Sequence, residues 1–272
     1  MREHWFGFFK GNVFFSYARC TGCGLLFCPR YFSSDALGRL YSEMPDNMSI
    51  VATDALEATQ RGYFDVLKKH SSLAGHYLEI GPDTGLFTQF AAREGRFQKF
   101  WLFEPNLRVH EKLRATVGDL AANISTQMFG FDDAPEGKVE VAVAIHVLDH
   151  LLDPMASLRA LRSRLAPGAR VLFVTHDESS ALAKLVGRRW PAYCLQHPHL
   201  FNPQSIAELL AKAGYRVLET QRTKNRFPVT FLLENGMWAM GLPHWKLPSL
   251  PRLQVSLKLG NIATVAEPMG MA

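Results

Sequence analysis

The sequence predicts an α/β protein with a doubly wound, mostly parallel sheet of seven strands and helices on both faces. From His76 onward, short apolar runs alternate with helix-like stretches. The runs are apolar nearly throughout, which is typical of strands that are buried on both faces of a parallel sheet. We expect strands at Tyr77–Ile80, Phe100–Phe103, Ile124–Phe129, Val139–Ile145, Val171–Thr175 and Tyr215–Glu219, and a final strand pair or one bent strand within Leu253–Glu267.

Residues that start and stop helices separate several of these strands. Asp153-Pro154 and Asn202-Pro203 each place an N-cap residue before a proline at the first helical position. The first of these helices is expected to stop at Pro167-Gly168 and the second at Gly214.

The chain is expected to have three parts. Residues 1–34 form a small aromatic element that holds three of the four cysteines. Residues 35–70 are predicted to be a helical cap, with helices around Tyr41 and Tyr63 that close over a cleft. Residues 71–272 form the α/β domain.

Composition excludes several other classes of protein. The 272 residues are 47% apolar and 20% charged, which is neither disordered nor coiled-coil composition. No stretch reaches about 18 uncharged apolar residues, so no membrane span is expected. Four cysteines do not form a disulfide scaffold, and a reducing cytoplasm is the expected location. The net charge of +5 is spread along the chain, which makes nucleic acid an unlikely partner.

A glycine loop follows the first expected strand. The segment Tyr77–Gly85 has the pattern strand, tight glycine turn, helix, and glycines there let a ligand approach main-chain N–H groups. Glu104 ends the next strand, roughly 20 residues further on, where an acidic side chain can accept hydrogen bonds from ribose hydroxyls. This combination predicts a site for a ligand that contains adenosine.

These residues resemble the class I, Rossmann-like S-adenosylmethionine-dependent methyltransferases. Leu78-Glu79-Ile80-Gly81-x-x-x-Gly85 followed by Phe103-Glu104-Pro105 resembles the first motif of that family and its successor. Further matches occur in the family's order at Val147–Leu151, Asp153-Pro154, Leu165–Gly168, Gly187-x-x-Trp190, His199-x-Phe201, Ala213–Tyr215 and Leu259–Ile262, and the later ones resemble a subgroup that includes sugar C-methyltransferases.

The resemblance implies methyl transfer from S-adenosylmethionine to a small molecule such as a sugar, a glycan or another metabolite. The residues it implies for the cofactor are Glu79, Gly81, Asp83, Gly85, Glu104 and Asp132. Asp83 stands where the family has the middle glycine of its loop. Its side chain either crowds the cofactor's carboxylate, faces its ammonium group or caps the next helix.

Histidines are concentrated where the acceptor is expected. His146 and His150 follow the fourth strand and His176 follows the fifth, at the sheet edge where such folds bind ligands. An imidazole titrates near neutral pH and can take a proton from an acceptor. His150 and His199 are the predicted catalytic residues, and Trp190 either stacks on the acceptor or anchors a loop.

The subgroup often opens with Cys-x-x-Cys zinc knuckles, and Cys20-Thr-Gly-Cys23 resembles one of them. Structural zinc needs four ligands. Cys20 and Cys23 are the predicted zinc ligands, with His4 and Cys28 as residues that could complete the site.

Three other functions fit part of the sequence. A catalytically silent protein of the same fold would bind the cofactor or a partner, and Asp83 favours it. A nucleic-acid methyltransferase would need a basic face and an Asn/Asp-Pro-Pro-aromatic motif, where this chain has His146–His150. A dinucleotide-dependent oxidoreductase fits the glycine loop but not the later motifs.

Overall fold

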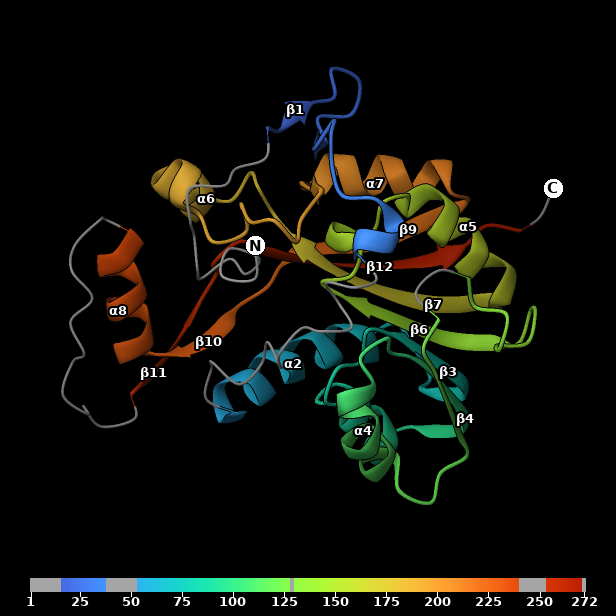
Figure 1. The fold of residues 1–272 in the computed structure, drawn as a ribbon. Helices are drawn as coiled ribbons and strands as arrows, with labels where there is room; N and C mark the ends of the chain where they lie inside the picture. Colours follow the sequence, from blue (N-terminus) through green and yellow to red (C-terminus); the bar gives the residue numbers. More distant parts are fainter. Residues whose placement is uncertain (1–15, 38–52, 128–129, 240–252, 271–272) are drawn as a thin grey trace.

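The computed structural model describes residues 16–37, 53–127, 130–239 and 253–270. Its centre is a seven-stranded sheet with the order β5-β4-β3-β6-β7-β12-β9 (Figure 1). The fold class predicted from the sequence is therefore confirmed. The strands are β3 (Ala74–Ile80), β4 (Arg96–Phe103), β5 (Ala122–Ser125), β6 (Val139–Ile145), β7 (Leu165–His176), β9 (Tyr215–Arg222) and β12 (Asn261–Pro268).

Most of the sheet is parallel. β3 to β7 pair in parallel, whereas β12 runs antiparallel to both of its neighbours, β7 and β9. The chain proceeds outward from β3 to β4 and β5, and then returns to β6 on the other side of β3. This reversal creates a crevice at the carboxyl ends of β3 and β6, where open sheets of this kind bind ligands.

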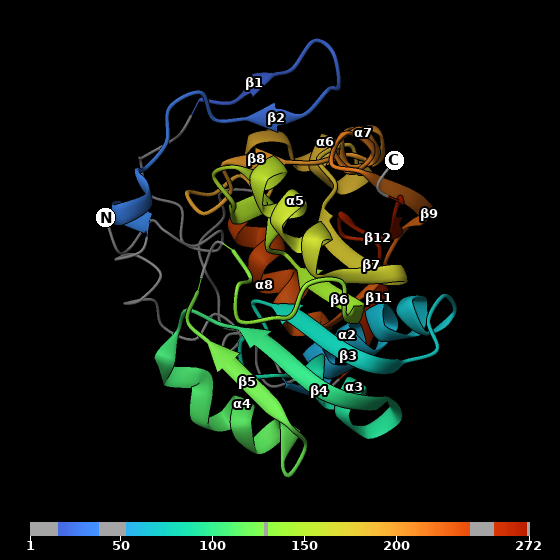
Figure 2. The same cartoon turned by 90° about the vertical axis from the view of Figure 1, so that its right-hand side faces the viewer.

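Helices cover both faces of the sheet (Figures 1 and 2). One layer consists of α2 (Thr53–Lys68), α3 (Thr88–Glu94) and α4 (His110–Val117), and the other of α5 (Pro154–Arg164) and α7 (Pro203–Lys212). Each layer has its own buried apolar cluster against the sheet. The alternation of side chains along the buried strands feeds both clusters, which explains why the strands are apolar nearly throughout.

The predicted helix starts are present, but one predicted stop is wrong. The Asp153 side chain accepts a hydrogen bond from the Ala156 N–H at 2.9 Å, and Asn202 forms a capping box with Ser205. However, α5 ends at Arg164, and Pro167-Gly168 lies inside β7. The strand begins early because Leu165 already pairs with Val139 of β6.

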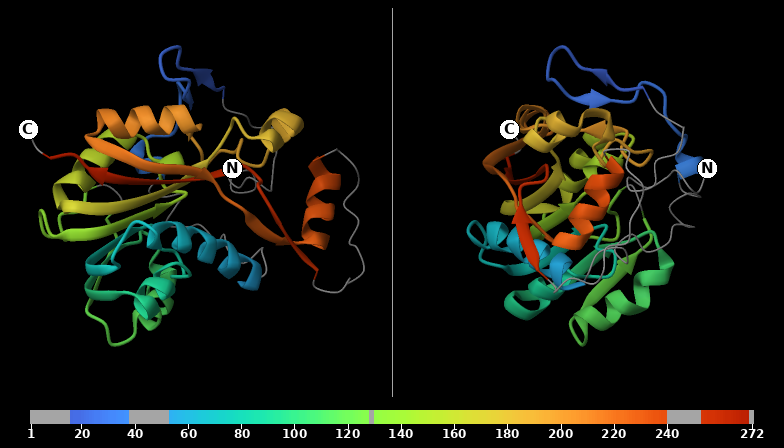
Figure 3. Two further views of the ribbon diagram at one scale, coloured as in Figure 1. Left: turned by 180° about the vertical axis from the view of Figure 1, so that it is seen from behind. Right: turned by 90° about the vertical axis from the view of Figure 1, so that its left-hand side faces the viewer.

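Smaller elements surround the sheet. β1 (Ala18–Arg19), β2 (Leu26–Phe27) and β8 (His199–Leu200) form a three-stranded sheet above α7, near α6 (Ala181–Val186). β10 (Asn225–Pro228), α8 (Val229–Ala239) and β11 (Gln254–Leu257) extend from one end of the molecule (Figure 3). The short helices are η3 (Leu107–Val109), η4 (Leu148–His150) and η5 (Gly187–Arg189).

The structure differs from the sequence prediction in the final segment and in the expected cap. The final segment is not a strand pair, because β11 pairs with β10 while β12 enters the main sheet. The described part of the expected cap, α2, packs directly on the sheet, and Tyr63 is buried there. Tyr41 and His4 lie outside the described residues, as do the last residues of the strand predicted at Ile124–Phe129. None of the described helices combines the length and apolar character that a membrane crossing requires.

Candidate functional site

The glycine loop joins β3 to α3 at the carboxyl edge of the sheet. Gly81 has a φ of +66° and Gly85 a φ of +82°, which are left-handed backbone conformations that glycine adopts readily. A Cβ atom on Gly85 would lie 2.9 Å from the Leu113 Cδ1 atom of α4, and one on Gly81 would lie 3.0 Å from Val147 Cγ2. The positive φ values and the close side chains therefore both favour glycine at these two positions.

Asp83 has a left-handed backbone conformation, which glycine adopts more readily than other residues. Its φ is +51°, a region in which aspartate occurs more often than most residues. Its main-chain N–H donates a hydrogen bond to Glu104 Oε2 at 2.9 Å. The replacement of the family's glycine thus leaves the course of the loop intact.

Glu104 links the ends of β3 and β4. Its Oε1 atom accepts a second main-chain hydrogen bond from Asn106, at 2.8 Å. Burial raises the pKa of this carboxyl group, and the two N–H donors from Asn106 and Asp83 oppose that effect. A carboxylate offers about four acceptor positions. The two main-chain donors leave acceptor capacity for the two hydroxyls of a ribose.

Glu79 is buried within β3. Its Oε2 atom accepts hydrogen bonds from the Tyr77 hydroxyl at 2.6 Å and the Thr88 hydroxyl at 2.7 Å. Burial raises its pKa to about 7, although both hydrogen bonds favour the charged form. Because Thr88 is the first residue of α3, Glu79 holds the start of that helix against the strand.

Asp132 lies at the surface, where its side chain is 80% exposed and pairs with the Arg164 guanidinium at 2.7 Å. The preceding Phe131 packs against Phe103, the last residue of β4, so this segment passes the carboxyl edge of the sheet. The role of Asp132 in cofactor binding stays a prediction.

Four histidine rings form a chain of contacts at the carboxyl ends of β6 and β7. The centroid of His176 lies 4.4 Å from that of His146 and 4.6 Å from that of His197, and His197 lies 4.8 Å from His150. We call these four residues the histidine group. They come from three segments of the chain, and their clustering confirms that the strand ends converge.

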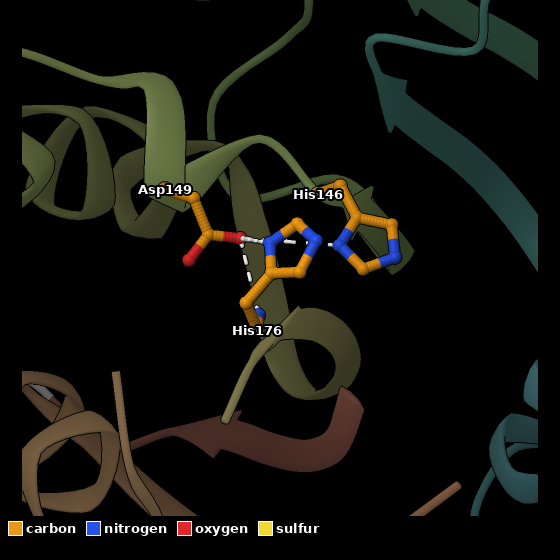
Figure 4. Close-up of side chains that lie close together, drawn as sticks. All are labelled: His146, Asp149 and His176. Carbon is orange, nitrogen blue, oxygen red and sulfur yellow. Dashed lines mark hydrogen bonds and ion pairs between the residues drawn. The ribbon is translucent and has the colours of Figure 1, made fainter. Parts of the chain in front are cut away.

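Asp149 is the charged centre of the histidine group. It is fully buried, and its Oδ2 atom accepts hydrogen bonds from the main-chain N–H of His176 at 3.2 Å and from His176 Nδ1 at 3.0 Å (Figure 4). Burial opposes ionisation, but the His176 and His146 rings outweigh it and hold the pKa of Asp149 well below its usual range. Burial, followed by the neighbouring His146, lowers the pKa of His176 to about 4. His176 is thus a neutral donor to a charged carboxylate.

The two predicted catalytic residues lie beside this centre. His150 ends η4, and burial holds its pKa well below the ordinary value. His199 lies in β8, which contacts η4, and burial lowers its pKa to about 4. Both rings are therefore neutral near pH 7, the form in which an imidazole can accept a proton.

The segment after η5 completes this side of the site. Trp190 is buried, and its ring lies edge-on to His176 with a centroid separation of 6.1 Å. Cys194 Sγ lies 3.4 Å from His197 Nδ1. Burial opposes the charged form of His197, but Cys194 and Asp149 outweigh it and raise the pKa of His197 to about 9.

The interactions behind His146 could not be read from the sequence. Asn261 Nδ2 lies 3.2 Å from His146 Nε2 and donates to the Tyr63 hydroxyl at 2.9 Å. Asn261 comes from β12, which enters the sheet beside β7 although it is far away in sequence. His146 has a φ of +53°, a conformation that costs a non-glycine residue roughly 1–2 kcal/mol.

Among the described residues, no group of three or more potential metal ligands includes Cys20 or Cys23. Cys20 and Cys23 lie in the turn between β1 and β2, where main-chain N–H groups of Cys23 and Gly22 lower the pKa of Cys20. Within the described ranges, the only group of three or more potential metal ligands is His146, Asp149 and His176. The described residues therefore do not support zinc at Cys20 and Cys23.

A hollow of about 700 Å³ lies beside the β1–β2 turn. Its polar lining includes Arg19, which donates to both oxygens of Glu178, and Asn202, which donates to one of them at 3.0 Å. Arg19 and Glu178 thus already satisfy one another, and Lys184 is a further cation in the lining.

Comparison with known proteins places this site within a family. The family described as a methyltransferase domain matches residues 55–220, more than half of the chain. That range includes the glycine loop, Glu104 and the histidine group. No curated protein matches the sequence.

Several solved structures share the fold at low identity. An S-adenosylmethionine-dependent methyltransferase of Mesorhizobium loti is 13% identical with a TM-score of 0.51, over 75% of this chain and 97% of that one. DhpI in complex with SAH is 16% identical with a TM-score of 0.52, over 87% and 95%. A chain from the complex of the Haloferax volcanii Trm112 methyltransferase activator with a methyltransferase is 15% identical with a TM-score of 0.53, over 80% and 96%.

Proposed function

The chain belongs to the methyltransferase-domain family, and on that premise we propose that it transfers the methyl group of S-adenosylmethionine to a small-molecule acceptor. The observation that carries the proposal is the position of Glu104. Its carboxylate is fixed beside the glycine loop by the N–H groups of Asp83 and Asn106 and keeps acceptor capacity for a ribose. The cofactor would supply an electrophilic methyl group at the crevice between β3 and β6.

The residues that hold the cofactor would act in different ways. Glu104 would accept hydrogen bonds from the ribose hydroxyls. Gly81 and Gly85 would let the loop follow the cofactor closely, with Asp83 between them. Glu79 would act indirectly, since it binds Tyr77 and Thr88 and so fixes the beginning of α3.

The acceptor would occupy the side of the crevice beyond β6 and β7. Methyl transfer from a sulfonium requires the acceptor, the methyl group and the sulfur to be in line, so much of the catalysis is positioning. We assign the removal of the acceptor's proton to His150, with His199 as the second candidate, because His150 ends η4 just after β6 and β8, which holds His199, contacts η4. The segment Trp190–Phe201 would line the acceptor.

A sugar, a glycan or a similar metabolite is the acceptor class that we propose. The support is the resemblance of Gly187-x-x-Trp190 and His199-x-Phe201 to a subgroup with sugar C-methyltransferases. In the structure these segments lie close to the histidine group, since Trp190 contacts His176 and β8 contacts η4.

A silent cofactor-binding protein is the alternative that Asp83 favoured. The positive φ of Asp83 weakens this alternative, because the loop has the conformation that a glycine would give it. A hydroxyl or carbon acceptor also needs a base, and His150 and His199 supply imidazole rings on the acceptor side of the crevice.

Calorimetry with S-adenosylmethionine and S-adenosylhomocysteine tests the proposal directly. We expect both to bind, and NADH, which also carries an adenosine ribose, to bind far more weakly. The absence of binding heat for both sulfur ligands at millimolar concentration would overturn the proposal. Preferential binding of NADH would instead identify a dinucleotide enzyme.

A further inference from the structure

We propose that His146, Asp149 and His176 bind a divalent transition-metal ion. One ligand atom from each of these three side chains lies within 4.8 Å of the others. The three residues come from the loop after β6, from η4 and from the end of β7. Figure 4 shows the Asp149 carboxylate and the two rings directed toward one another.

One polar atom that faces the centre of the trio, His146 Nδ1, is buried and has no hydrogen-bond partner. Asp149 Oδ1 is also without one, but it points away from both rings (Figure 4). Buried polar atoms in native proteins are nearly always satisfied, and an unsatisfied one is a reason to look for a missing ion or water. His146 Nδ1 lies 3.9 Å from Asp149 Oδ2, too far for a hydrogen bond but suitable for two ligands of one ion.

The residues around the trio can orient its ligands. Asn261 Nδ2 lies 3.2 Å from the other ring nitrogen of His146, Nε2. With its amide turned so that Oδ1 faces the ring, Asn261 would accept the Nε2–H of a His146 ring that binds an ion through Nδ1. The main-chain N–H of His176 donates to Asp149. Groups that bind the far side of a ligand fix its orientation and are a usual part of metal sites.

The ligand set indicates the kind of ion. Two imidazoles and one carboxylate suit first-row transition ions such as Fe²⁺, Mn²⁺, Co²⁺ or Zn²⁺ and leave coordination positions open. Asp149 is fully buried, whereas the side chains of His146 and His176 are 28% and 20% exposed. An ion could therefore enter from the side of the two rings and remain accessible to another molecule.

The position of the ion suggests its use. Val147, the neighbour of His146, touches Gly81 of the glycine loop, so the trio lies next to the cofactor crevice. There the ion would bind an acceptor oxygen and make its proton easier to remove, as a Lewis acid does. This use rests on the proposed function, whereas ion binding itself does not.

Cobalt titration of the metal-free chain tests the site. The protein is treated with a chelator and then titrated with Co²⁺ by calorimetry and visible absorption. The C20S/C23S double variant serves as the parent, which removes thiolate binding by the β1–β2 turn. We expect one ion per chain, and a loss of affinity of more than about 100-fold in Asp149→Asn and in His146→Gln, because loss of an outer-shell partner alone costs 10–100-fold.

A matched control separates this site from other histidines. His70 lies 2.7 Å from Glu219 and so offers another histidine–carboxylate pair outside the trio. His70→Asn should leave the cobalt affinity unchanged. An equal loss in His70→Asn, unchanged affinity in His146→Gln, or no saturable binding in the parent would each overturn the proposal.

Binding of S-adenosylhomocysteine in the same samples keeps the two proposals separate. A variant that binds this ligand normally is folded, so its loss of cobalt is specific. If the parent binds S-adenosylhomocysteine but no cobalt, the metal site is wrong and the proposed function stands. If the parent binds cobalt but neither S-adenosylmethionine nor S-adenosylhomocysteine, the proposed function is wrong and the metal site stands.

Discussion

The main-chain N–H of Asp83 donates a hydrogen bond to the Glu104 carboxylate at 2.9 Å, and this bond joins the glycine loop after β3 to the end of β4. The same carboxylate also accepts from Asn106. Glu104 therefore has two tasks that can be separated by mutation. It holds the loop in place, and it is the proposed ligand of the cofactor ribose.

Glu104→Gln should weaken S-adenosylhomocysteine binding roughly tenfold to hundredfold by calorimetry. An amide has only one acceptor atom, so its NH₂ group would face one of the two main-chain N–H donors. A hydrogen bond to a charged group contributes about 1.5–3 kcal/mol, which corresponds to that loss of affinity. Glu111→Gln, which removes an exposed carboxylate from α4, is the control. Unchanged affinity in Glu104→Gln would remove Glu104 from the ribose site.

Asp83→Gly should strengthen S-adenosylhomocysteine binding by up to about tenfold. The substitution preserves the positive φ and removes a negative charge and side-chain bulk next to the expected carboxylate of the ligand. Asp83→Asn separates the two effects, because it removes the charge and keeps the size. Weaker binding in both variants would show that the Asp83 carboxylate makes a favourable contact, such as one with the ligand's ammonium group.

The sheet could be predicted from the sequence because its strands are buried on both faces. The predicted bounds of Val139–Ile145 agree with β6, and the capping residues Asp153 and Asn202 begin α5 and α7. The helix ends before the predicted stop because Leu165 already pairs with β6, and Pro167-Gly168 lies at an irregularity in the register of β7. Local signals cannot show when a neighbouring strand supplies hydrogen bonds.

The site was only partly predictable for a similar reason. The sequence placed His146 after the fourth strand and His176 after the fifth, so both residues were expected at the same edge of the sheet. Asn261 and its contact with His146 were not, since β12 enters the sheet antiparallel from the end of the chain. The ion pair of Asp132 with Arg164 could not be predicted either, because the two residues are 32 positions apart in the chain.

Glu79→Gln should change how stability depends on pH. The pKa of Glu79 is about 7 in the folded chain against a reference value of 4.5. Between these pH values the folded state holds a proton that the unfolded state has lost, so this group lowers the free energy of unfolding as pH rises from 4.5 to 7. The loss is on the order of 3 kcal/mol and is complete above the folded pKa.

The glutamine variant lacks this titration and can still accept from the Tyr77 and Thr88 hydroxyls. Urea unfolding at pH 5 and pH 8 should therefore show a smaller fall in stability for Glu79→Gln than for the wild type. All other titrating groups are common to the two proteins. Parallel pH profiles would mean that Glu79 is ionised at its ordinary pKa in the folded chain.

Gly85→Ala should destabilise the fold more than Gly137→Ala. Both glycines have positive φ values, +82° and +63°, so alanine brings backbone strain of roughly 1–2 kcal/mol at either position. A Cβ atom at Gly137 meets nothing within 4 Å, whereas at Gly85 it would lie 2.9 Å from Leu113 Cδ1 and 3.1 Å from Thr116. Overpacking of this kind costs typically about 1–3 kcal/mol more.

Urea unfolding of the two alanine variants measures that difference. The Gly85→Ala/Leu113→Ala double variant tests its cause, because shortening Leu113 removes the closest atom of the overlap. Leu113 is buried, so its truncation alone is also destabilising. If the overlap is responsible, the double variant loses less stability than the sum of the two single variants. Equal losses in Gly85→Ala and Gly137→Ala, together with additivity in the double variant, would show that backbone strain alone requires Gly85.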